Sequence, residues 1–165
     1  MLFFKFFARI QFLLTSTNQH GVHSPFVFDF ITKGLYKKLP NSATSNDFLT
    51  VQNLNKKEQK IFLNLINYFQ IDTIYTSVNE LENTFNENYK LLLIKNIPQF
   101  SLKTIPVKSS KLIVIFNDLH SNKANQEKWV ALCKNSKATV TIDLFYFGLI
   151  FFRKEQAKEH FKIRV

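Results

Sequence analysis

Apolar residues recur at helical spacing in four segments of the chain, which predicts four amphipathic helices. These segments are residues 1–16, 25–34, 56–70 and 122–136. Ser24 and Pro25 suit the start of the second helix, because a hydroxyl can cap the first turn and a proline at the first helical position loses no hydrogen bond. Gly34 is expected to end that helix.

Continuous apolar runs of strand length predict a buried sheet. The predicted strands are residues 72–77, 90–96, 111–118, 138–145 and 148–153, with a turn or short helix and then a final strand at 161–165. Only Tyr146 and Phe147 separate two of these runs, so they should form an antiparallel hairpin with Gly148 at its junction. Strands that alternate with helices and end in a hairpin indicate an α/β fold.

The 165 residues fit one structural domain. Residues 1–36 are interpreted as an N-terminal helical extension packed on the core, and residues 56–165 as the α/β domain proper. Between them, residues 40–55 are rich in Ser, Thr and Asn and are expected to form a loop. The polar segment 78–89 is expected to be helical.

Residues 1–16 admit two interpretations. The segment is too short to span a bilayer, and it lacks both the cationic start and the small-residue cleavage site of a signal peptide. It is either an amphipathic helix packed on the domain, which we prefer, or an interfacial helix with phenylalanines in lipid and Lys5 and Arg9 at the headgroups. The expected location is therefore the cytoplasm, with peripheral contact at the inner membrane surface as the alternative.

Composition narrows the function classes. The net charge of +10 suits nucleic acid or an anionic membrane, but the lysines are scattered and no nucleic-acid motif is present, so a solvated basic surface is favoured. Cys133 is the single cysteine and falls in a helical segment, which indicates a packed thiol in a reducing compartment. His20 and His23 lack a third ligand nearby, so we expect no metal site.

Three stretches of the chain resemble a family of bacterial class I S-adenosylmethionine (SAM)-dependent methyltransferases. They are HGVHSPFVFDFI, FNDLHSNKANQEKW and TIDLFYFGLIFFRKEQAKEHFKIRV, which cover about 20–36 and 111–165. The resemblance implies a Rossmann-like sheet of seven strands whose last two form an antiparallel hairpin. Residues 37–110 match poorly.

The cofactor turn departs from the family pattern. Relatives bind SAM with a turn resembling ELGTSLGIST after the first strand, and this chain has DTIYTSVNELENTF there. Thr76 and Ser77 match and are the candidate cofactor-binding residues, but Tyr75 replaces a glycine and the preceding acid is absent. Glycine is absent from the whole stretch between Gly34 and Gly148, so no backbone there can approach a cofactor as closely as glycine allows.

The sheet is also expected to be shortened. Only about a dozen residues separate Ser77 from the strand that begins at Lys90, which leaves room for one helix and not for two strands with crossovers. We therefore expect the second and third strands of the family sheet to be missing. A strand at 72–77 would then lie near an edge, which a homodimer, a partner chain or the N-terminal helices would cover.

The family's DDIHWS segment reads NDLHSN here, so Asp118 and His120 are the candidate catalytic residues. Either would act as a base on a methyl acceptor. The alternative roles are a helix cap for Asp118 and a hydrogen bond within the loop for His120. The favoured interpretation is a methyltransferase-like protein with an eroded SAM site and a structural or binding role. The alternatives are an active methyltransferase on an unknown small acceptor and a basic module that binds membrane or nucleic acid.

Overall fold

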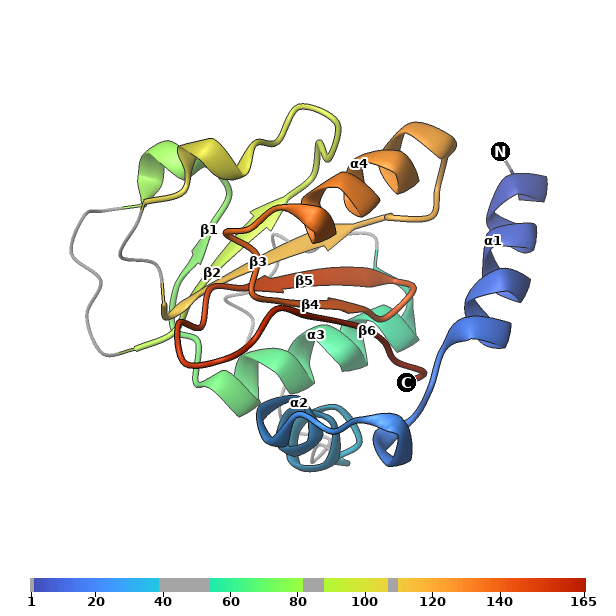
Figure 1. Cartoon of the computed structure of the whole chain (residues 1–165), viewed down its shortest axis with the longest axis horizontal. Helices are drawn as coiled ribbons and strands as arrows, with labels where there is room; N and C mark the ends of the chain where they lie inside the picture. The colour runs from blue at the N-terminus through green and yellow to red at the C-terminus, as the bar shows by residue number, and fades with distance from the viewer. Residues whose placement is uncertain (1, 39–53, 82–87, 107–109) are drawn as a thin grey trace.

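The fold is a mixed sheet with helices on both faces (Figure 1). The computed structural model describes residues 2–38, 54–81, 88–106 and 110–165. Its strands are β1 (Ile74–Tyr75), β2 (Lys90–Ile94), β3 (Leu112–Asn117), β4 (Val140–Asp143), β5 (Phe147–Phe151) and β6 (Glu159–Lys162). Its helices are α1 (Leu2–Thr15), α2 (Pro25–Asp29), the π-helical turn η2 (Phe30–Leu35), α3 (Lys56–Phe69) and α4 (Lys123–Lys134), with short 3-10 turns η1 (Gln19–Gly21), η4 (Val78–Glu80) and η5 (Leu102–Thr104).

The order of the strands across the sheet is β1-β2-β3-β5-β4-β6. β5 is antiparallel to both of its neighbours, and every other adjacent pair is parallel. The strands β1, β2, β3, β4 and β6 therefore run in one direction, and their carboxyl ends share one edge of the sheet. This confirms the predicted α/β class and the terminal hairpin, and it places β1 at an edge as expected.

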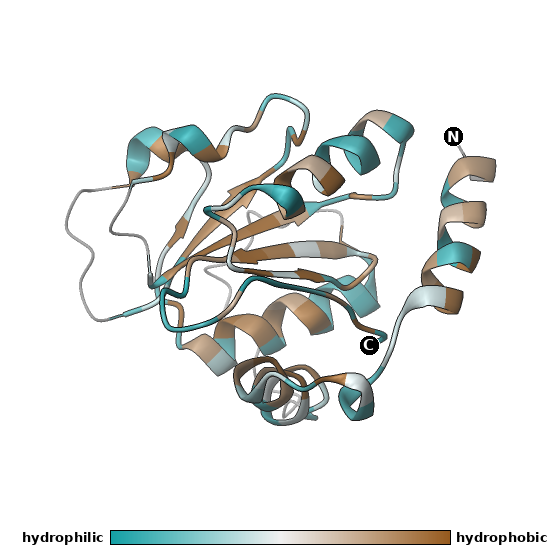
Figure 2. Cartoon of the chain, in the orientation of Figure 1, coloured by the Kyte–Doolittle hydropathy of each residue, from teal (hydrophilic) through white to brown (hydrophobic). Residues whose placement is uncertain are grey.

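Two apolar clusters lie on opposite faces of the sheet. One unites α2, η2 and α3 with residues of β3 and β5, and contains Phe30, Phe69 and Phe151 with ring centroids 5.0 to 6.3 Å apart. The other lies under α4 and packs Trp129 against Phe116. Nearly every residue of the central strands is buried, which explains why their sequences are apolar runs, as the colours of Figure 2 show.

The helix start predicted from Ser24 and Pro25 is correct, and a cap also stabilises the start of α3. The Ser24 hydroxyl accepts a hydrogen bond from the amide of Val27, and Asn55 forms a reciprocal capping box with Glu58 at the start of α3. The prediction for Gly34 is wrong: the chain continues past α2 as η2, and Gly34 lies buried within that turn. No helix follows β5, since residues 154–156 only turn before β6.

Two other expectations need correction. Gly148 is not at the hairpin junction but inside β5, paired with Asp143 and with Phe116. Of the segment 78–89, residues 78–80 form the 3-10 turn η4 and residues 82–87 lie outside the described residues. Residues 40–53 of the predicted loop also lie outside them. The described residues contain no strand between Ser77 and Lys90, in line with the shortened sheet.

Candidate functional site

Asp118 lies directly after β3, at the edge where the carboxyl ends of the parallel strands meet. Its backbone is left-handed with φ of 56°, and the Asn117 side chain accepts a hydrogen bond from its amide at 2.9 Å. Its carboxylate is half-exposed and lies 3.7 Å from the Lys5 ammonium of α1. Asp118 does not cap α4, because Asn122 accepts the hydrogen bond from the first turn of that helix.

His120 is turned into the protein. Its Nε2 donates to Asp143 at the end of β4, 2.9 Å from Oδ2, and its ring stacks on Phe145 with the planes 9° apart. Only 6% of His120 and 1% of Asp143 is exposed. His120 Nδ1 has no hydrogen-bond partner among the described residues. The alternative of a hydrogen bond within its own loop is therefore wrong, because the partner of His120 comes from another strand.

Asp143 joins the loop after β3 to the hairpin. Besides His120, its Oδ1 accepts a hydrogen bond from the Phe145 amide at 2.8 Å. Phe145 has a left-handed φ of 69°, so the hairpin turns on a phenylalanine and not on a glycine. A carboxylate that holds the amide two residues ahead stabilises such a turn. Sequence reasoning missed Asp143, although it is the charged residue within the TIDLF stretch.

A cavity of about 520 Å³ opens between α1 and this edge of the sheet. Asp118 and Ser121 line one side, and Lys5, Phe6 and Arg9 of α1 line another. His120 is not part of its lining. The structure therefore brings Asp118 into a cavity and leaves His120 behind it, so the two predicted catalytic residues do not face a common substrate.

The cavity combines cations with aromatic rings. The Arg9 guanidinium lies 4.4 Å from the centre of the Phe145 ring and 5.4 Å from that of Tyr146. The Lys57 ammonium lies 5.6 Å from the centre of the Tyr146 ring, and burial, followed by repulsion from Arg9 and Lys60, lowers the pKa of this ammonium. Such a surface suits a ligand with an anionic group or a flat ring.

Thr76 and Ser77 lie at the end of β1, away from this cavity. The carboxylate of Glu80 accepts hydrogen bonds from the backbone amides of Thr76, at 3.0 Å, and of Ser77, at 3.4 Å. The Ser77 hydroxyl in turn accepts from the Asn79 amide, which completes a capping box around η4. The backbone amides of Thr76 and Ser77 in the predicted cofactor turn are thus bonded within the chain itself. Tyr75 points away from the turn and packs into the cluster under α4.

A second cavity, of about 500 Å³, lies at the opposite edge of the sheet. Arg153 borders it, with its guanidinium 4.1 Å from the centre of the Phe26 ring and a hydrogen bond of 3.1 Å to the Tyr89 hydroxyl. It also forms an ion pair with Glu155. These contacts hold Arg153 in place, and none of the predicted site residues lines this cavity.

No family model, curated protein or solved structure matches the chain. Within the described residues, no group of three or more His, Cys, Asp or Glu side chains could hold a metal ion. In the same part of the chain, no helix has the length and apolarity needed to cross a bilayer.

Cys133 should be nearly inert in the folded protein. It lies on α4, partly buried against the cluster under that helix, and burial raises the pKa of its thiol to about 12, so almost no thiolate is present at pH 8. We expect iodoacetamide to alkylate it about a thousandfold more slowly in the native protein than in the urea-unfolded chain. Mass spectrometry of timed samples measures both rates. Equal rates would mean that the thiol is exposed.

Proposed function

We propose that this chain is a reduced relative of the class I SAM-dependent methyltransferases that acts by binding and not by methyl transfer. The terminal antiparallel hairpin agrees with the family sheet, and so does a parallel sheet that begins at β1. The edge position of β1 supports the loss of the second and third strands. That loss would remove the strand that supplies an acid to the ribose hydroxyls of SAM.

The observation that carries this proposal is the bonding of Glu80. In the family, the turn after the first strand leaves its backbone free to approach the methionine and ribose of SAM. Here Glu80 closes on the amides of Thr76 and Ser77, and the Ser77 hydroxyl is engaged by the next turn. SAM would have to displace Glu80 before it could bind the amides of Thr76 and Ser77, and each of these hydrogen bonds costs free energy to break.

The other end of the site gives further support. A methyl acceptor needs a base within hydrogen-bond reach of the proton it loses. The Nε2–H of His120 donates to the buried Asp143, and the Asp118 carboxylate faces the ammonium of Lys5. An active methyltransferase would need one of these groups free to face its acceptor, but His120 does not line the cavity, and Asp118, which does, faces Lys5.

We expect no binding of S-adenosylhomocysteine, which is the product that class I enzymes usually hold well. With the ligand at about 1 mM, a dissociation constant of about 1 µM would add about 4 kcal/mol to the free energy of unfolding. Urea titrations with and without the ligand should instead overlap. Isothermal calorimetry on the same sample provides an independent measurement.

A Glu80→Ala variant serves as the matched control, since it frees the amides of Thr76 and Ser77. We expect this variant also to bind no S-adenosylhomocysteine, because the ribose-binding strand is missing in both proteins. Micromolar binding by the unaltered chain would overturn the proposal in favour of an active methyltransferase.

A further inference from the structure

The helix α1 has two apolar faces that point in opposite directions. On one face, Ala8 and Phe12 are buried and pack with Phe145. The other face carries apolar side chains that are exposed: Phe3, Phe6, Phe7, Ile10, Leu13 and Leu14. At 100° per residue these six positions span about a third of the helix circumference, centred opposite Ala8 and Phe12. The sequence pattern alone did not distinguish the two faces.

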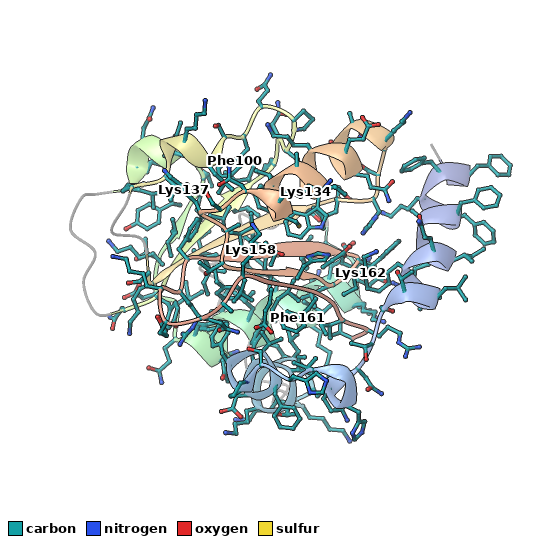
Figure 3. The ribbon with its side chains drawn as sticks, viewed as in Figure 1. Phe100, Lys134, Lys137, Lys158, Phe161 and Lys162 are labelled. Carbon is teal, nitrogen blue, oxygen red and sulfur yellow. The ribbon has the colours of Figure 1, made fainter. Side chains whose placement is uncertain are left out.

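This exposed face, which we call the α1 apolar face, lies at the margin of the molecule. Figure 1 shows α1 standing apart from the sheet, and in Figure 3 aromatic side chains project from it away from the domain. Phe3 and Leu14, near its two ends, are 81% and 82% exposed. Soluble monomers rarely leave a contiguous surface of this kind open, so it indicates a contact site.

The charges around this face indicate what covers it. The first acidic residue of the chain is Asp29, and the two cations of α1, Lys5 and Arg9, lie on the side of the helix that lines the cavity. At the far end of α1, the Lys162 ammonium lies 3.3 Å from the Thr15 hydroxyl. The whole chain carries +10. An anionic surface would therefore be attracted to α1, and a second copy of the chain would be repelled.

The shape of the face suits a bilayer. It follows a single helix of 14 residues, which is about 21 Å long. A bilayer needs no matching rigid surface, because phenyl and leucyl side chains enter the acyl boundary individually.

We propose that α1 docks this protein onto anionic lipid bilayers. The helix lies in the plane of the interface, with the α1 apolar face in the acyl boundary and the positive net charge of the chain attracted to the anionic headgroups. The buried face stays packed on Phe145 throughout, so docking requires no opening of the fold. This inference is independent of whether SAM binds.

Vesicle co-sedimentation tests it with the full chain. We expect binding to vesicles of equal phosphatidylglycerol and phosphatidylcholine, weaker binding at high salt, and little binding to phosphatidylcholine alone. The triple variant Phe3→Gln, Phe7→Gln, Leu14→Gln should lose at least about tenfold in affinity. All three side chains are exposed, so the variant should keep the unfolding midpoint of the parent.

The matched control is Phe28→Gln with Val130→Gln, because these two apolar side chains are also exposed but lie outside α1. The control should bind vesicles like the parent. Equal binding by the triple variant, or no binding to anionic vesicles by the parent, would overturn the inference. So would a dimer in light scattering that the triple variant abolishes, because a second copy would then cover the face.

Discussion

Replacing Asp143 by alanine is expected to lower the free energy of unfolding by about 3 kcal/mol. The change leaves two buried groups without their acceptor, the Nε2–H of His120 and the amide of Phe145. It also removes the group that holds Phe145 at its left-handed φ, which is costly for an aromatic residue. Urea titration followed by circular dichroism measures the loss.

Two comparisons separate this effect from a general loss of charge. Asp72→Ala removes an exposed carboxylate and should change the free energy of unfolding by less than about 0.5 kcal/mol. Asp143→Asn keeps an acceptor oxygen, so its cost should lie between those of the two alanine variants. A loss below about 1 kcal/mol for Asp143→Ala would show that the buried pair contributes little to folding.

Gly148→Val is expected to cost about 3 kcal/mol, through overpacking inside β5. A Cβ at this position would lie 2.7 Å from a methyl group of Leu119 and 2.9 Å from the six-membered ring of Trp129. The Leu119 methyl can move aside, but the indole is wedged against Phe116. Valine otherwise suits a strand, so a loss of stability here must come from this contact. Thermal and urea unfolding give the magnitude.

A double variant tests the cause. Trp129→Phe removes the part of the indole that a Cβ at position 148 would meet. Gly148→Val should therefore cost less in the Trp129→Phe background than in the parent, and the two changes should not be additive. Additive losses would place the strain elsewhere in β5.

Gly148 illustrates what could and what could not be predicted from the sequence. The two apolar runs around residues 138–153 were enough to predict an antiparallel hairpin, because the two-residue gap between them left no room for a crossover. They were not enough to place Gly148, since a glycine near a short gap is typical of a turn. Its actual role depends on Trp129 of α4, whose indole ring lies so close to position 148 that a Cβ there would meet it.

For the predicted site residues too, the sequence indicated their place in the sheet but not their contacts. The position of Asp118 and His120 after a buried strand correctly put both at the carboxyl edge of the sheet. Only the packed structure distinguishes them, because Asp118 meets α1 from the start of the chain and His120 meets β4 from its end. Thr76 and Ser77 were predicted to bind a cofactor, but their amides donate to Glu80, and no spacing rule anticipates those bonds.

The sequence by itself determined the elements of this protein and their order, since helix caps, apolar periods and apolar runs act within a few residues. It also determined that the described residues hold no strand between Ser77 and Lys90, because so short a segment leaves no room for a strand with its crossovers. Tertiary structure decided the rest: the insertion of β5 between β3 and β4, the cavity under α1 and the open apolar face. These features depend on contacts between residues far apart in the sequence. The helix α1 has apolar residues on two sides, so its helical pattern is the same whichever side packs on the domain.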